Sequence, residues 1–143
     1  MTPGRPLSPS TALLLLLAAA AGCAKTLPDQ DRRIALATPV TKTTTEILLK
    51  EYRDNPAEAT RKYFGQAVEL AGNVTAVGTG ANNHSFVMFE QKDPPAGQGV
   101  QANLLDDQAA EIVAANIIGS RLRLKCFADG LAGNLILRSC VRP

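Results

Sequence analysis

The sequence contains little of what catalytic and metal sites usually require. It has a single histidine, His84, three cysteines and no tryptophan, and aromatic residues make up only 4% of its 143 residues. Metal centres need several converging ligands, and nucleophilic catalysis needs a base beside the nucleophile. Since nothing in the sequence pairs with His84, we interpret it as a turn residue and expect a protein without catalytic residues, a metal site or a cofactor.

An excess of positive charge is also absent. Of the 15 basic residues only Arg5 precedes Cys23, so 14 basic residues face 13 acidic ones in the rest of the chain. Proteins that bind nucleic acid usually carry a clear basic surplus. The overall composition therefore disfavours nucleic acid as the partner.

The longest apolar run, residues 12–22, is too short to span a membrane. It holds 11 residues, whereas a spanning helix needs about 20. It fits the apolar core of a signal peptide and ends in the small residues before Cys23. This pattern resembles the signal of bacterial lipoproteins, although an ordinary signal peptide cut at an alanine-rich site is the alternative.

The resemblance implies an exported protein. Residues 1–22 would be a signal peptide, and Cys23 would carry the lipid, including a palmitate. The protein would then be held in the cell envelope and face the periplasm or the exterior, with the membrane as one partner. By the same resemblance, Ala24 after the cysteine favours the outer membrane of a Gram-negative organism.

Residues 23–42 read as a flexible, lipid-anchored tether. They combine two prolines with charges of both signs and show no sustained periodicity. The alternative is that Ile34, Leu36 and Val40 dock on the domain that follows.

Cys126 and Cys140 remain as a pair if Cys23 is acylated. Export to an oxidising compartment makes a disulfide the default for such a pair. Pairing them directly places Leu131 opposite Leu135 around a short turn, which suits two antiparallel strands.

The pattern from residue 43 onward predicts two helices and then a β-rich domain. Residues 43–46 fit a capping box before a helix over 47–54, and Asn55 with Pro56 begins a second helix that ends at Gly65. A short helix is expected over 108–115. The expected strands span 66–77, with Gly72 at a bulge or bend, and then 85–90, 100–104, 119–128 and 134–141.

Five strands with a helix between the third and fourth follow the order of the OB-fold, a small Greek-key barrel. We therefore predict a mainly β fold in residues 43–143: a five-stranded OB-fold barrel behind an N-terminal helical segment.

Residues 45–143 also resemble the bacterial tRNA-anticodon-like (tRNA_anti-like) family of OB-folds. That family has a helical lead-in, a strand with the pattern Y-G-x-x-V-x-x-x-G-x-V, and a final hairpin with paired cysteines. The matching residues are Tyr63, Gly65, Val68, Gly72, Val74, Cys126, Gly130 and Cys140. The resemblance implies a fold; it does not establish tRNA binding, and it brings no catalytic residues with it.

OB-folds usually bind ligands on the face of strands two and three. Residues 66–104 carry a net charge of −2. Successive side chains of a strand face opposite sides, so of Phe86 and Phe89, which are three positions apart, at most one points outward. A groove for single-stranded nucleic acid needs positive charge and aromatic platforms. The expected face therefore has the wrong sign for phosphates.

Arg121, Arg123 and Lys125 alternate along the fourth strand. They could hold an anionic ligand together with Arg138 or Arg142, or they could form the solvated outer face of a half-buried strand. We predict a non-enzymatic envelope lipoprotein that binds or scaffolds an unidentified envelope protein or a glycan. The alternative is an OB-fold module for nucleic acid or oligosaccharide.

Overall fold

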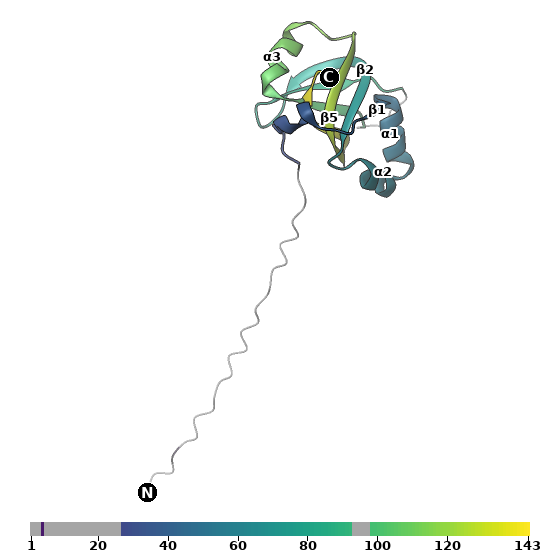
Figure 1. Cartoon of the computed structure of the whole chain (residues 1–143), viewed down its shortest axis with the longest axis vertical. Coiled ribbons are helices and arrows are strands. Elements are labelled where there is room, and N and C mark those ends of the chain that lie inside the picture. Colours follow the sequence, from purple (N-terminus) through teal and green to yellow (C-terminus); the bar gives the residue numbers. More distant parts are fainter. Residues whose placement is uncertain (1–3, 5–26, 93–97) are drawn as a thin grey trace.

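Five strands close into a barrel in the computed structural model, which describes Gly4, residues 27–92 and residues 98–143 (Figure 1). The strands are β2 (Ala67–Thr79), β3 (Ser85–Phe89), β4 (Val100–Leu104), β5 (Arg121–Ala132) and β6 (Asn134–Val141). They pair in the order β2-β3-β4-β6-β5, and β5 pairs back with β2. Only the β4–β6 pair in this ring is parallel. This is the predicted OB-fold arrangement.

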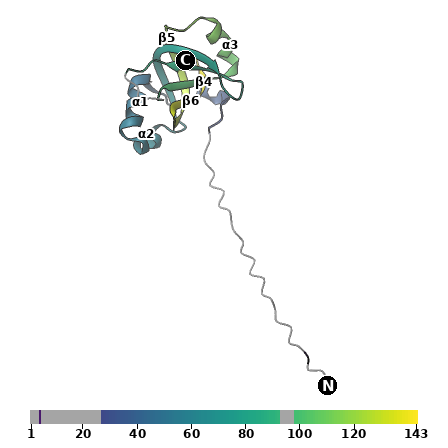
Figure 2. The ribbon, with the colours of Figure 1, turned by 180° about the vertical axis from the view of Figure 1, so that it is seen from behind.

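Helices cover two sides of the barrel. They are α1 (Thr45–Asp54), α2 (Pro56–Tyr63) and α3 (Asp106–Ala114). Figures 1 and 2 show α1 and α2 together on one side and α3 on the other. Thr44 caps α1 by accepting a hydrogen bond from the Ile47 N–H, and Asn55 caps α2 as predicted by accepting from the Glu58 N–H.

Inward side chains of the barrel and of the α1–α2 pair form one core. Leu48 and Tyr52 of α1 are buried, and the Tyr52 ring stacks on Tyr63 of α2 with 6.0 Å between ring centroids. A disulfide between Cys126 and Cys140 joins β5 to β6 inside this core, as predicted. The helical lead-in is thus part of the packed domain.

Residues 27–40 also pack against the barrel, and they are called the N-terminal strap below. The strap contains the short 3₁₀ helix η1 (Arg32–Leu36), whose Ile34 is fully buried in a second apolar cluster, with Val40 packed against it. Leu36 points away and is 87% exposed. The predicted flexible tether is therefore wrong for residues 27–42, because the buried side chain of Ile34 and a network of hydrogen bonds hold the segment in place.

The strand β1 (Thr41–Thr44) follows the strap and pairs in parallel with the first half of β2. The folded domain therefore begins before residue 43, the predicted boundary. Cys23 and residues 1–22, apart from Gly4, lie outside the described residues, so the lipidation site and the signal peptide remain predictions.

The β5–β6 hairpin is longer and less regular than predicted. Its strands continue to Ala132 and Asn134 around Gly133, which has a φ of 74°, so most of the connection predicted over 129–133 is strand. The register shifts twice: Asp129 is an extra residue in β5, and Ser139, with a φ of 55°, lies in the extra length of β6. Both bulged residues contact Arg138 or the strap.

Gly72 permits close packing rather than a bulge. The β2–β5 pairing passes through Gly72 without interruption, and the register shift of β2 against β3 lies beyond it, after Val74. A Cβ atom on Gly72 would lie 2.7 Å from the Thr45 Oγ1 and 2.9 Å from the Phe89 Cδ1. The small residue is needed because α1 and β3 both press against the strand here.

Candidate binding faces

The outer side of β3 and β4, the second and third strands of the barrel, is the face on which OB-folds usually bind ligands, and β6 extends this side because it pairs with β4. Strand alternation buries Val87, Phe89 and Ala102, and so turns their neighbours outward. We refer to the outward set as the amide face: Phe86, Met88, Gln101, Asn103, Asn134 and Ile136. As predicted, only one of the two phenylalanines points outward.

Side-chain amides in this face are organised by one another. The Gln101 Nε2 donates to the Asn103 Oδ1 at 3.0 Å, and the Asn134 Nδ2 donates to the Gln101 Oε1 at 3.5 Å. The Asn134 Oδ1 accepts from the Gly99 N–H at 3.0 Å. Each amide carries both donors and acceptors. The amides of this face can therefore form hydrogen bonds with a polar, uncharged chain, next to the apolar surface of Phe86.

One end of the amide face is occupied by Asp29 of the strap. This carboxylate accepts from Arg138, from the Asn82 Nδ2 at 3.2 Å and from the Asn103 Nδ2 at 3.4 Å. These residues line a hollow of about 160 Å³ together with His84 and Gln101. Burial raises the pKa of Asp29, but its hydrogen bonds and the charge of Arg138 outweigh burial and hold the pKa below its ordinary value. The hollow thus contains a paired rather than a free cation.

His84 has a partner that sequence reasoning missed. Its Nδ1 lies 2.9 Å from an Asp106 carboxylate oxygen at the start of α3. The two residues are 22 positions apart in the sequence, and only the closure of the barrel brings them together. The contact joins the β2–β3 turn to α3, so His84 is more than an isolated turn residue.

The amide face is close to neutral, which corrects the negative charge expected of it. Glu69 belongs to the β2–β5 side of the barrel, where it forms an ion pair with Arg123. Glu90 lies beyond the end of β3, and it accepts from the Asn73 Nδ2 at 3.1 Å. A count along the sequence placed both carboxylates on the binding face, but the pairing of the strands directs them elsewhere.

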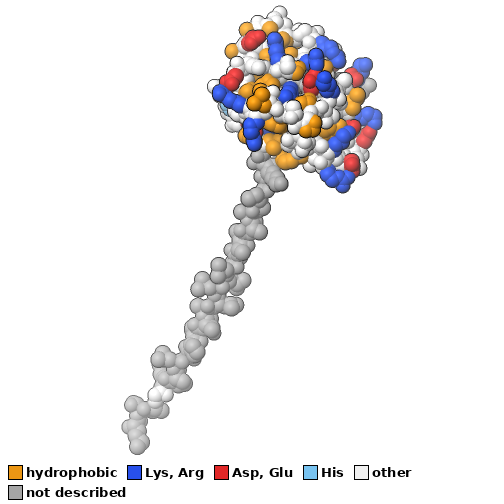
Figure 3. All heavy atoms as spheres, viewed as in Figure 1, with side chains coloured by type: hydrophobic (Ala, Val, Ile, Leu, Met, Phe, Trp, Pro, Cys, Tyr) orange, Lys and Arg blue, Asp and Glu red, His pale blue; other side chains and the backbone are white. Residues whose placement is uncertain are grey.

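The alternating cations of β5 do not converge on a common point. Arg123 is paired with Glu69, and the Lys125 Nζ donates to the Ala35 carbonyl at 3.3 Å. Figure 3 shows the side of the molecule that carries β5 and η1, with acidic side chains scattered among the basic ones. The arrangement matches the solvated outer face given as one of the two interpretations.

Arg138 and Arg142 do not join this row. Arg138 is held between Asp29 and Asp129. The Arg142 guanidinium lies 3.6 Å from a Glu111 carboxylate oxygen on α3. Each of the two is therefore already paired with a carboxylate and does not complete the row of cations.

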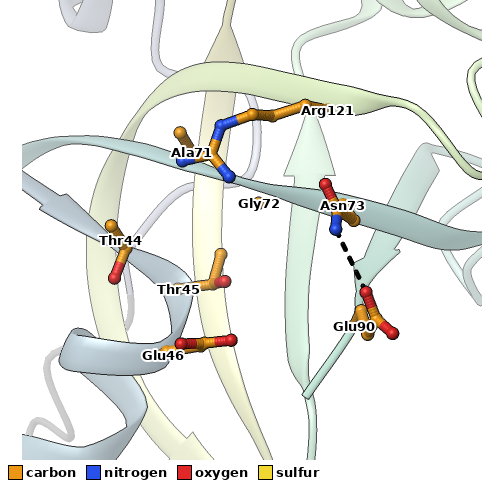
Figure 4. A pocket seen from close by; sticks show the side chains of 8 residues that line it. All are labelled: Thr44, Thr45, Glu46, Ala71, Gly72, Asn73, Glu90 and Arg121. Atoms are coloured by element: carbon orange, nitrogen blue, oxygen red, sulfur yellow. Dashed lines mark hydrogen bonds between the residues drawn. The ribbon is translucent and has the colours of Figure 1, made fainter. Parts of the chain in front are cut away.

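Arg121 lines a second hollow, of about 180 Å³, between the start of α1 and β2. Figure 4 shows its guanidinium beside Ala71 and Gly72, above Thr45, with Asn73 bonded to Glu90. Glu46 and Glu90 line the same hollow. Because two carboxylates share it with one guanidinium, it has no net positive charge with which to attract an anion.

Within the described part of the chain, no cluster of three or more His, Cys, Asp and Glu residues is arranged to hold a metal ion. No helix in that part combines the length and the apolar character needed to cross a bilayer.

The closed five-stranded barrel defines a small OB-fold protein. The sequence model of the tRNA_anti-like family matches residues 10–141, so the chain belongs to the tRNA_anti-like family. A search of the curated proteins finds no match.

Solved structures share the fold. One is a Klebsiella pneumoniae protein described as a "putative nucleic acid-binding lipoprotein", which is 18% identical, with a TM-score of 0.51. The alignment covers 71% of this chain and 92% of the Klebsiella protein. At this identity the likeness supports the OB-fold alone.

Proposed function

We propose that this protein is a lipid-anchored envelope protein whose OB-fold barrel binds or scaffolds a partner without catalysing a reaction. The observation that carries the binding role is the amide face, which presents linked amides around one aromatic ring with no unpaired charge. The apolar run before Cys23 supports export and lipidation, and the name of the Klebsiella neighbour is consistent with a lipoprotein.

The amide face favours a polar, uncharged chain as ligand. Amides such as Gln101 and Asn103 can donate to and accept from hydroxyl groups or peptide bonds, and Phe86 offers an apolar surface for a sugar ring or a side chain. A glycan of the envelope fits these features best, and a segment of an envelope protein is the other partner expected.

Site-specific crosslinking in living cells tests this role. A photoreactive amino acid replaces Gln101 in the full-length chain, and a matched control replaces Thr60, which is exposed on α2. We expect an adduct from position 101 and none from position 60. Sensitivity of the adduct to glycan-cleaving enzymes identifies a glycan, and sensitivity to protease identifies a protein. Equal adducts at both positions, or none, contradict the assignment of the face.

Lipidation has its own test. Replacing Cys23 with serine removes the thiol that would carry the lipid, so acyl labelling should disappear and unprocessed precursor should accumulate. Continued labelling of the Cys23→Ser variant would show that the lipid, if present, is attached elsewhere.

Nucleic-acid binding is the second candidate, and the basic row on β5 is the observation that favours it. Suppose that Arg121, Arg123 and Lys125 each contacted a phosphate of a single-stranded oligonucleotide. A plot of the logarithm of the affinity against the logarithm of the salt concentration would then have a slope of about −2. The double variant Arg121→Ala, Arg123→Ala should then flatten that slope. A slope near zero for the unmodified protein removes this candidate.

A further inference from the structure

The strap holds the start of the folded domain close to the lipid anchor. The Gln30 side chain donates to the Leu104 carbonyl at 3.0 Å and accepts from the Asp106 N–H at 2.8 Å. The buried Ser139 hydroxyl accepts from the Asp31 N–H at 2.8 Å and donates to the Pro28 carbonyl at 3.0 Å. These hydrogen bonds begin within a few residues of Cys23 and attach the strap to both β4 and β6.

The remaining connection is short. Four residue steps separate Cys23 from Leu27, and a fully extended chain spans at most about 3.6 Å per residue, so the two lie at most about 14 Å apart. If Cys23 is acylated, as proposed above, its acyl chains enter the bilayer beside the part of the barrel that carries Leu27. The domain is therefore held against the lipid surface rather than suspended above it.

Leu27 identifies which side of the barrel is near the anchor. The Cδ2 atom of its side chain lies 3.8 Å from the position that a Cβ on Gly65 would take. Gly65 in turn lines a wide, shallow hollow with Leu36, Arg33 and Phe127. The anchor thus joins the domain next to η1, which lies beside β5 in Figure 1.

The chemistry of this side suits a lipid surface. Leu36 is 87% exposed, the highest value among the exposed large apolar side chains of the described residues. Arg32 and Arg33 belong to the same short helix, Arg33 lines a hollow together with Leu36, and the Lys125 ammonium donates to the carbonyl of Ala35, the residue before Leu36. An exposed apolar side chain on a segment that also carries cations is typical of segments that lie at the level of lipid headgroups.

Electrostatic attraction is the smaller part of this contact. Arg32 shares its charge with Asp107 at 2.9 Å and Arg33 with Asp31 at 2.6 Å. Both aspartates reduce the attraction to anionic headgroups, so the burial of Leu36 provides the main gain. One leucine alone would hold a free protein weakly, but the acyl anchor keeps it at the surface continuously.

We propose that η1 docks on the bilayer that holds the Cys23 lipid, with Leu36 inserted among the headgroups and Arg32, Arg33 and Lys125 around it. This inference rests on the proposed lipid anchor. It gives the barrel a fixed orientation on the membrane, with the η1 side toward the lipid.

The absence of tryptophan provides a direct test. Leu36→Trp introduces a single tryptophan into the full-length, lipidated protein, which is reconstituted in phosphatidylethanolamine and phosphatidylglycerol vesicles brominated near the headgroup end of the acyl chains. Ile118→Trp is the matched control. Ile118 is 58% exposed and precedes Arg121, the first residue of β5, at the end of the strand away from η1. The two ends of the β2–β5 pairing, Arg121 and Phe127, are six residues apart, or about 20 Å along the strand.

The tryptophan emission of the Leu36→Trp variant should shift to shorter wavelength and lose roughly half of its intensity or more, because a side chain about 5–10 Å inside the headgroup boundary lies among the bromines. The control emission should stay unchanged, and far-UV circular dichroism should match for both variants. Similar emission from both variants on vesicles that carry the protein overturns the proposed orientation. Vesicle flotation is measured separately: a protein that does not float with the vesicles lacks the anchor, which overturns the proposed anchoring and this inference together.

Discussion

Replacing Ile34 with alanine tests whether the strap is part of the folded domain. The side chain is fully buried among Ala67, Leu105 and Val141, in a cluster separate from the main core. Truncating a buried isoleucine to alanine typically costs about 2–5 kcal/mol, the sum of lost burial and a cavity. The strap can relax toward the barrel more easily than a core strand can, so we expect a cost of about 2–3 kcal/mol, at the lower end of that range.

The assay is reversible unfolding of residues 23–143, with Cys23→Ser in every sample so that no lipid or free thiol is present. A domain of this size changes its melting temperature by about 3–5 °C per kcal/mol, so Ile34→Ala should lower it by about 6–15 °C. Leu36→Ala is the control in the same segment: Leu36 is 87% exposed, so the change should stay within about 0.5 kcal/mol.

Equal stability of the Ile34 and Leu36 variants would refute the packed strap and restore the flexible tether. A chain that starts at Thr41 gives the complementary result. It lacks Ile34 and all strap hydrogen bonds, and it uncovers the apolar surface of Ala67 and Leu105. It should therefore be less stable than the Ile34→Ala variant, as measured by the urea concentration at half-unfolding.

Three further outcomes are expected. Reducing the Cys126–Cys140 disulfide should cost roughly 3 kcal/mol, the chain-entropy value for a loop of about 15 residues, and quantitative labelling of both thiols without reductant would contradict the bond. Gly72→Val should destabilise the domain in thermal unfolding because its side chain has no space between Thr45 and Phe89, and a stabilised variant would refute this. The pKa of Asp29 is held below its ordinary value in the folded protein by Arg138, so the stability that Asp29 provides is complete above the pKa of the unfolded chain and is lost as the pH falls through the lower pKa of the folded state. Asp29→Asn should be less stable at pH 7 and should flatten the acid limb of a stability–pH curve, and an unchanged limb would show that another carboxylate controls it.

Local sequence patterns determined much of the fold. Strand alternation, helix caps and the position of one helix predicted the five strands, their order and hence the OB-fold. The Asn55-Pro56 start of α2 and the pairing of Cys126 with Cys140 were also predictable. Each of these signals acts between residues that are neighbours in the sequence or in one hairpin, so reading along the chain is sufficient to find them.

Only the tertiary structure determined which residues come together at the candidate site. Asp29 and Arg138 are 109 positions apart, and His84 and Asp106 are 22 apart, so no local pattern connects either pair. The charge of the binding face was misjudged because strand pairing directs Glu69 toward Arg123 on β5, away from the amide face.

The strap shows the same limit most clearly. Its composition is typical of a linker, and a single buried side chain, Ile34, provides almost no periodic signal. Its place is set by partners that exist only once the barrel has closed: the Ser139 hydroxyl, which the bulge of β6 presents, and the apolar pocket of Ala67, Leu105 and Val141. The sequence by itself determined the barrel, and the closed barrel determined where the segment next to the predicted anchor lies.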